Sequence, residues 1–252
     1  MSHVIAVANQ KGGVAKTTTV HSLGAALAER GRQVLVVDLD PQACLTYSLG
    51  VAADGLQRSL HDVLVRQVPV QDVLLKVGDL HLLPATIDLA GTEIHLLSKT
   101  GREYALARAL APIAGDYDVV LIDCPPSLGI LTIDGLTAAS QVLIPLQCET
   151  LSIRGVGQLL ETVADVRSFT NAGLGVMGVV ATMFDGRTRL GQQILASVRD
   201  DYGLEVLQPP VPKSVRVAEA PGASRSVLEH APRSPAAEAY RELAAAIEAR
   251  LR

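Results

Sequence analysis

Short apolar runs alternate with longer amphipathic stretches along the chain. The apolar runs predict buried strands at Val4–Ala8, Val34–Val37, Leu80–Leu83, Val119–Ile122, Val142–Leu146 and Val176–Ala181, with a weaker strand at Val206–Val211. The stretches between them have helical periodicity at Thr17–Arg30, Ser59–Val65, Arg102–Ala114, Ser127–Ala139, Ile153–Phe169, Leu190–Tyr202 and Pro235–Leu251. This alternation predicts an α/β fold with a doubly wound, mostly parallel sheet and helices on both faces.

The pattern continues without an internal repeat, a low-complexity tract or a linker. We therefore expect residues 1–252 to form one domain. The least regular stretch is the proline-rich segment Pro209–Pro235, where only a short helix is predicted, at Ser214–Glu219. Segments of this kind run over the surface of a protein and often carry function.

Composition agrees with a sheet covered on both faces. Hydrophobic residues make up 48% of the chain but aromatic residues only 3%, so the core is predicted to be aliphatic. The net charge is −4, which argues against a histone-like polycation and means that any contact with nucleic acid needs a local basic patch. The N-terminus lacks the features of a signal peptide, and no apolar run approaches the roughly 20 residues of a membrane span. We expect a soluble, cytoplasmic protein.

The first predicted strand leads into the segment Asn9–Thr18, and an alanine-rich helix follows. A phosphate-binding loop requires this strand, loop and helix. Gly12 and Gly13 would let backbone N–H groups converge on phosphate oxygens, and the helix N-terminus adds its positive dipole end. Lys16 would reach the β- and γ-phosphates and the Thr17 hydroxyl would bind Mg²⁺, so ATP and Mg²⁺ are the predicted ligands.

The loop departs from the strict pattern G-x-x-x-x-G-K-[ST], because Gln10 and Ala15 replace its two glycines. A positive φ at Ala15 would cost on the order of 1 kcal/mol. We expect a negative φ there, with nucleotide binding intact. An additional lysine, Lys11, lies five residues before Lys16, although the whole chain has only five lysines.

The run K-G-G-x-x-K-T-[ST] with this first lysine resembles the deviant Walker A motif of the ParA/MinD group of P-loop ATPases. The resemblance implies a P-loop NTPase fold, slow ATP hydrolysis and ATP contacts from Lys11, Gly12, Gly13, Val14, Ala15, Lys16, Thr17 and Thr18. It also implies that Lys11 crosses a dimer interface to the other subunit's nucleotide, where it acts much as an arginine finger does. Lys11 and Lys16 are thus predicted catalytic residues.

Two predicted strands end in carboxylates, at the edge where ligands bind in open α/β sheets. The element Asp38-Leu39-Asp40-Pro41-Gln42 resembles the switch region of the group, which implies that Asp40 positions the attacking water and that Asp38 supports the Mg²⁺ shell or the switch. Asp123 begins a run, D-C-P-P-S-L-G, that is similar to the ParA form of Walker B. Thr17, Asp40 and Asp123 are the predicted Mg²⁺ residues.

Two segments of the second half carry the resemblance further. Residues 182–190 resemble the T-M-x-D-x-R-T-x-L element of the family, and residues 211–221 resemble its I-P-R-N-V-R-x-x-E-A-P segment, with Ser214 in place of asparagine. The resemblance implies adenine contacts from Met183, Pro212 and Ser214. It further implies a DNA surface, with salt-sensitive phosphate contacts, made of Arg187, Arg189, Lys213, Arg216 and Arg225.

The resemblance therefore implies a ParA-type partitioning ATPase, an ATP-bound homodimer that binds double-stranded DNA nonspecifically on the nucleoid and is stimulated by a ParB-like protein. Another cargo-positioning ATPase of the ParA type is an alternative. A MinD-like membrane ATPase is a second alternative, but it needs a C-terminal amphipathic helix with bulky apolar residues, whereas residues 240–252 are rich in alanine and look like a packing helix. We therefore expect no membrane partner.

Three further alternatives use the same scaffold. A nitrogenase-type iron protein needs paired cluster cysteines, but Cys44, Cys124 and Cys148 lie far apart and are expected to be buried thiols. A ligase of the dethiobiotin synthetase type needs a small carboxylated substrate. A scaffold that binds but does not hydrolyse ATP disagrees with the presence of Lys11 and Asp40.

Overall fold

The computed structural model describes residues 2–149 and 152–251. Within these residues eight strands form one sheet, in the order β3-β4-β2-β5-β1-β6-β7-β8. The strands are β1 His3–Val7, β2 Val34–Asp38, β3 Leu75–Val77, β4 Leu80–Leu83, β5 Val119–Asp123, β6 Gln141–Gln147, β7 Gly175–Thr182 and β8 Val206–Leu207. The β3–β4 pair is antiparallel and the other neighbouring pairs are parallel. The predicted doubly wound, mostly parallel sheet is thus confirmed.

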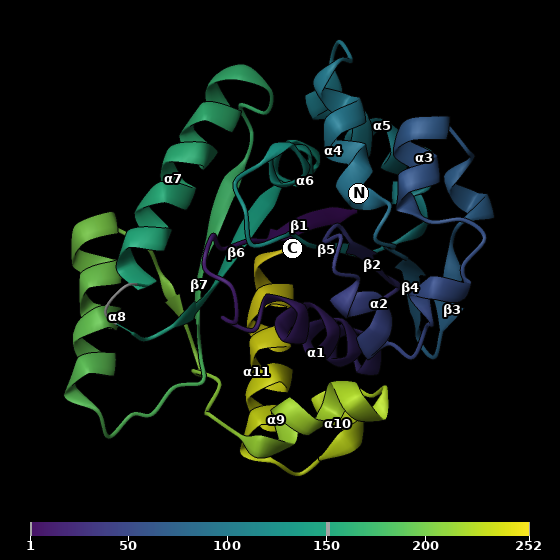
Figure 1. Ribbon diagram of the computed structural model, residues 1–252. Coiled ribbons are helices and arrows are strands. Elements are labelled where there is room, and N and C mark those ends of the chain that lie inside the picture. Colours follow the sequence, from purple (N-terminus) through teal and green to yellow (C-terminus); the bar gives the residue numbers. More distant parts are fainter. Residues whose placement is uncertain (1, 150–151, 252) are drawn as a thin grey trace.

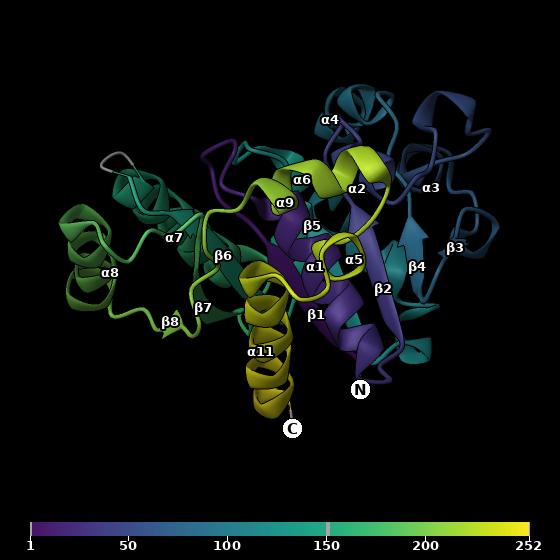
Figure 2. The same cartoon turned by 90° about the horizontal axis from the view of Figure 1, so that it is seen from below.

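Helices cover both faces of this sheet (Figure 1). One face carries α1 Lys16–Glu29, α2 Cys44–Ser48, α9 Val215–Glu219, α10 Val227–His230 and α11 Pro235–Arg250. The other face carries α3 Leu60–Arg66, α4 Leu89–Leu97, α5 Ala105–Leu110, α6 Ile130–Ala138, α7 Ser152–Phe169 and α8 Arg189–Tyr202. Figure 2, which views the molecule from below, shows α1 and α11 side by side.

Successive strand residues face opposite layers, so two aliphatic cores form. In β2, Leu35 and Val37 pack toward α3 and α5, while Val34 and Val36 pack toward α1 and α11. The C-terminal helix α11 buries Tyr240 and Ile247 on this second face. It is therefore the packing helix that its alanine content predicts. None of the helices in the described part of the chain has the length and apolarity needed to cross a bilayer.

Several predicted elements differ from the structure, each for a local reason. The predicted helix Arg102–Ala114 is a 3₁₀ turn followed by α5, which ends at Leu110, shortly before Pro112, because proline has no N–H to continue the helix. The predicted strand Val206–Val211 ends at Leu207 because Pro209 and Pro210 follow.

Four other elements were not predicted: the edge strand β3 and the helices α2, α4 and α10. β3, α2 and α10 are short, with three, five and four residues, whereas α4 has nine. The prediction of three buried cysteines is also wrong in part, because Cys124 is buried but Cys44 is exposed and Cys148 is half-buried.

Candidate nucleotide-binding site

The glycine-rich loop lies between the central strand β1 and helix α1, as predicted. Contacts to distant strands fix its backbone. The buried Asn9 donates from Nδ2 to the Pro145 carbonyl (2.7 Å) in β6, and the Thr182 hydroxyl at the end of β7 donates to the Val14 carbonyl (3.0 Å). The sequence motif did not single out Asn9 or Thr182, because their partners are 136 and 168 residues away. The loop is held in shape by the carboxyl ends of three parallel strands.

The expected negative φ at Ala15 is wrong. Ala15 has φ 64° and ψ 36°, a left-handed conformation, directly before the first residue of α1. The strict pattern has glycine at this position, and the chain retains that backbone turn although it carries a methyl group. An alanine in this conformation costs on the order of 1 kcal/mol. Gly13 also has a positive φ, 73°, which glycine adopts without this cost.

Thr17 and Asp123 form a pair suited to a divalent cation. The Thr17 hydroxyl donates to Asp123 Oδ2 (2.6 Å), whereas Asp123 Oδ1 is buried and, among the described residues, has no hydrogen-bond partner. Asp38 lies beside Asp123 in the register of β2 and β5. Burial raises the pKa of both carboxyl groups, and the nearby Asp38 carboxylate raises the pKa of Asp123 further, as the Asp40 carboxylate does for Asp38. Two adjacent buried carboxylates favour a cation between the loop and the strand ends.

Asp38 fixes the loop that follows β2. Its Oδ2 accepts hydrogen bonds from Thr46 N (2.8 Å) and Thr46 Oγ1 (2.7 Å), and its Oδ1 accepts one from Asp40 N (3.2 Å). Thr46 in turn accepts from Ala85 N (3.0 Å). The sequence prediction did not include Thr46. The buried Asp38 thus supports the backbone, and the half-buried Asp40 lies free at the edge of the sheet, where only Gln42 N donates to its Oδ1 (2.9 Å) among the described residues.

The two lysines of the loop point in different directions. Lys16 is buried, its Nζ donates to the Lys11 carbonyl (3.3 Å), and burial lowers its pKa. Lys11 instead directs its Nζ out of the loop, where it forms an ion pair with Glu149 and lies 3.5 Å from Ser152 Oγ. The sequence analysis did not identify Glu149. Thus Lys16 remains inside its own loop and Lys11 leaves it.

The predicted adenine segments lie side by side. Phe184 N donates to the Val211 carbonyl (2.9 Å), and Phe184 and Pro212 form a parallel bridge. Met183, which precedes Phe184, therefore lies on the segment next to that of Pro212. Met183 has a left-handed φ of 48°, at the turn that leaves β7. Ser214 directly precedes α9 and makes no side-chain cap to that helix.

The predicted basic residues are divided among three places. Arg187 and Arg189 lie at the start of α8, and Lys213 and Arg216 lie at the start of α9, on the neighbouring segment. Two of these side chains pair with nearby carboxylates, Arg187 with Asp185 (3.0 Å) and Arg216 with Glu219 (3.0 Å). Arg225 follows a 3₁₀ turn beyond α9, at a separate place.

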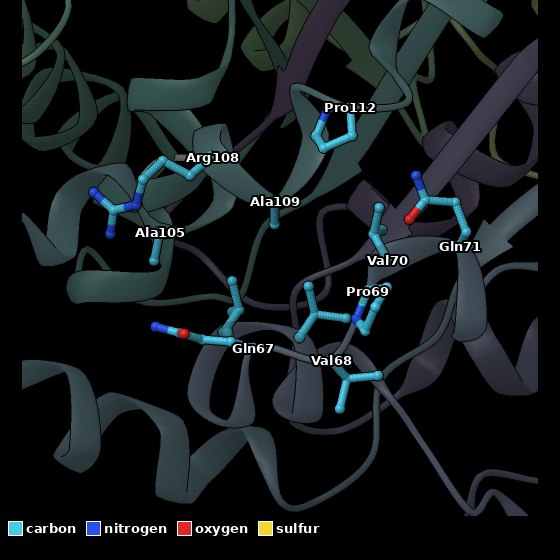
Figure 3. Close-up of a pocket in the computed structure, with 11 residues that line it drawn as sticks. Gln67, Val68, Pro69, Val70, Gln71, Ala105, Arg108, Ala109 and Pro112 are labelled. Atoms are coloured by element: carbon cyan, nitrogen blue, oxygen red, sulfur yellow. The ribbon is translucent and has the colours of Figure 1, made fainter.

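A separate pocket of about 410 Å³ lies between the end of α3 and α5 (Figure 3). Its walls are mostly apolar, and Arg108 is the charged residue among those that line it. None of its lining residues belongs to the glycine-rich loop or to the strand ends. It is therefore distinct from the candidate nucleotide site.

Comparison with known proteins agrees with this geometry. Residues 2–176 match the family model described as an AAA domain. The chain is 44% identical to the sporulation initiation inhibitor protein Soj of Bacillus subtilis, over 99% of each chain. It is 43% identical to the chromosome partitioning protein ParA of Caulobacter vibrioides, over 99% of this chain and 95% of that protein.

The chain belongs to the ParA/Soj family of chromosome-partitioning ATPases. Its P-loop fold also matches a Mycobacterium smegmatis structure named cobyrinic acid a,c-diamide synthase, which contains an ATP analogue and magnesium. The identity is 53% and the TM-score is 0.88, over 98% of this chain and 95% of that one. This chain keeps both loop lysines and carries Ala15 and Ser214 where the patterns given above have glycine and asparagine.

Proposed function

We propose that this ParA/Soj protein binds MgATP, pairs with a second copy of itself in the ATP state and then binds DNA nonspecifically. In this proposal it moves a chromosome or plasmid, and a ParB-like protein stimulates its slow hydrolysis of ATP. The observation that carries the proposal is the divergence of the two lysines: Lys16 lies inside its own loop, whereas the Lys11 ammonium points out of it. Because the Lys11 ammonium lies outside the phosphate site of its own protomer, it can reach a nucleotide bound by a second protomer.

The residues of the loop have separate roles in this proposal. Backbone N–H groups of Gly12 to Thr18 bind the phosphates together with the α1 N-terminus, and Lys16 contacts the β- and γ-phosphates. Asp40, at the edge of the sheet, accepts a hydrogen bond from the attacking water and orients it. Lys11 of the partner subunit would stabilise charge on the transferring phosphoryl group, so hydrolysis would depend on pairing.

The residues present fit magnesium. Among residues 2–149 and 152–251, no three His, Cys, Asp or Glu side chains form a metal-binding cluster. Mg²⁺ does not need such a cluster, because it commonly binds through one or two protein ligands, substrate phosphates and water. Thr17 Oγ1 and Asp123 Oδ1, which is buried and has no hydrogen-bond partner in the described part of the chain, would hold it. When bound, the ion would neutralise charge on the β- and γ-phosphate oxygens.

The basic surface supports DNA as the partner of the paired state. Arg187, Arg189, Lys213 and Arg216 lie on two adjacent segments, and a pair of protomers would present two such sets to a DNA backbone. A membrane partner has less support. The α11 helix buries its apolar side chains against α1, so they do not face outward.

The test is DNA binding by the purified protein with no nucleotide, with ADP and with a non-hydrolysable ATP analogue, at two salt concentrations. We expect tight binding only with the analogue, weakened by salt and by Arg216→Glu. Liposomes of anionic lipid form a parallel arm, in which no binding is expected. Equal DNA binding in all nucleotide states would refute the proposed switch.

A second candidate function rests on the name of the Mycobacterium smegmatis structure, which is that of an amide-forming ligase. A ligase of this kind would use ATP to activate a carboxylate of cobyrinic acid. ATP turnover by the protein is therefore measured in two conditions and compared: in the presence of DNA alone, and in the presence of cobyrinic acid plus glutamine or ammonia. Turnover that requires the acid and yields an amide would favour the ligase over the partitioning ATPase.

A further inference from the structure

Two residues from far along the chain hold the Lys11 side chain. Its ammonium forms an ion pair with the Glu149 carboxylate and lies 3.5 Å from Ser152 Oγ. Glu149 follows β6, and Ser152 is the first residue of α7. The side chains of Lys11 and Glu149 are 29% and 53% exposed, so both can change rotamer without disturbing the core.

The backbone of Lys11, by contrast, is fixed. Asn9 Oδ1 accepts a hydrogen bond from Lys11 N (3.0 Å), and Asn9 itself is buried and bonded to the Pro145 carbonyl in β6. A Cβ added to Gly155 in α7 would lie 3.3 Å from Asn9 Oδ1, so α7 packs closely against this residue. The Lys11 backbone is therefore fixed while its side chain can move, and the ion pair with Glu149 determines where that side chain lies in the single protomer.

We propose that Glu149 is a positioning residue for Lys11. In the single protomer the Glu149 carboxylate and the Ser152 hydroxyl hold the ammonium on the protomer's own surface. On pairing, the ammonium leaves them for the triphosphate of the partner subunit. Glu149 therefore competes with the nucleotide for Lys11, and this competition sets the protein concentration at which the ATP state pairs. The inference rests on the proposed ATP-dependent dimer.

The size of the effect follows from the exposure of the pair. An exposed ion pair changes an equilibrium by about 1.5- to 5-fold. Two such pairs open when one dimer forms, so loss of both lowers the dimer dissociation constant by about 2- to 25-fold. High salt screens an exposed pair, so the difference between variant and wild type shrinks as salt increases.

The experiment measures the dimer dissociation constant by sedimentation, with Mg²⁺ and a non-hydrolysable ATP analogue. Glu149→Gln is expected to pair more tightly than wild type, and Glu149→Asp, which keeps the charge, is expected to lie between them. Glu161→Gln is the matched control, because Glu161 is exposed on α7, the helix that follows Glu149 in the chain, and lies outside the ion pairs of the described residues. It should pair like wild type after correction for net charge.

The decisive comparison repeats the Glu149→Gln change in a protein that lacks the Lys11 ammonium. If Glu149 acts through Lys11, then Lys11→Gln and the double variant Lys11→Gln/Glu149→Gln pair equally, so the gain disappears. A gain that persists in the double variant overturns the inference, and so does a Glu149→Gln protein that pairs like wild type or less tightly. Wild type that stays monomeric with the analogue refutes the proposed dimer instead, so the two failures are distinguishable.

Discussion

The centre of the sheet and its β7–β8 side use charged residues in opposite ways. At the centre, Asp38, Asp123 and Lys16 are buried, and short contacts to Thr46 and Thr17 hold the carboxylates in fixed positions. On the β7–β8 side, Arg187 and Arg216 are exposed, and among the described residues they pair with carboxylates two and three residues away. Buried, fixed charges suit one small ligand of defined geometry, whereas exposed, mobile charges suit a repetitive polyanion.

Lys11 combines features of the charged residues in both regions. Its backbone is fixed as in the central site, while its side chain forms an exposed ion pair as the surface arginines do. A residue of this type can be exchanged between two partners, which a buried lysine such as Lys16 cannot. The contrast between fixed and exchangeable charges leads to three predictions and the backbone of the loop to a fourth, in descending order of expected effect.

The largest effect is expected at Asp40, the half-buried carboxylate of the central site. Asp40→Ala removes the group proposed to orient the attacking water, so turnover should fall about 10²- to 10⁴-fold while nucleotide binding persists. Steady-state phosphate release and a separate nucleotide-binding titration measure the two quantities. If turnover were unchanged, the proposed role of Asp40 would be wrong.

The next effect concerns Lys16, the buried lysine of the loop. Lys16→Ala removes a charged hydrogen-bond donor to the phosphates, which lowers nucleotide affinity by about 10- to 150-fold. Titration of a fluorescent ATP analogue measures the change. Lys76→Ala, at an exposed position on β3, is the control with the same change in charge and should bind as wild type does. Equal affinities for all three proteins would contradict the assigned site.

A smaller effect is expected on the β7–β8 side. The double variant Arg187→Ala/Arg216→Ala should reduce the slope of log affinity against log salt by about 2, because two phosphate contacts are lost. Asp185→Asn should act in the opposite direction, since it releases Arg187 from its ion pair.

Salt titrations of DNA binding in the ATP-analogue state provide both slopes. Arg199→Ala, exposed near the end of α8, serves as the control. If the control lowered the slope as much as the double variant does, the effect would reflect net charge and not this surface.

The smallest effect concerns the backbone of the loop. Ala15→Gly removes the left-handed strain of alanine but adds freedom to the unfolded chain, so the net gain in unfolding free energy is up to about 1 kcal/mol. Gly13→Ala should lose about 1 to 2 kcal/mol. A methyl at Gly13 would meet no atom within 4 Å, so that loss is conformational.

Thermal unfolding without nucleotide compares these two variants. A shift of about 2 to 4 °C per kcal/mol is expected for a chain of this size. Unfolding-temperature shifts of opposite sign for Ala15→Gly and Gly13→Ala would support the positive φ values at both positions, and shifts of the same sign would contradict them.

The sequence by itself determined the α/β class, most of the strands and the chemistry of the phosphate loop. These features are local: apolar runs mark buried strands, Lys16 and Thr17 follow the first strand after one glycine-rich loop, and Asp123 ends another strand. The carboxyl ends of parallel strands share one edge, so residues distant in sequence could be assigned to one site before the structure was known.

Only the tertiary structure decided how the charges are held. It assigned Thr46 to Asp38, Thr182 to the loop and Glu149 to Lys11, and it gave Ala15 a left-handed backbone against expectation. The Thr182 and Glu149 contacts join positions more than 100 residues apart, and the φ of Ala15 follows from how the loop must turn between β1 and α1. A local pattern specifies which groups are present, but packing between distant strands and helices decides which groups meet.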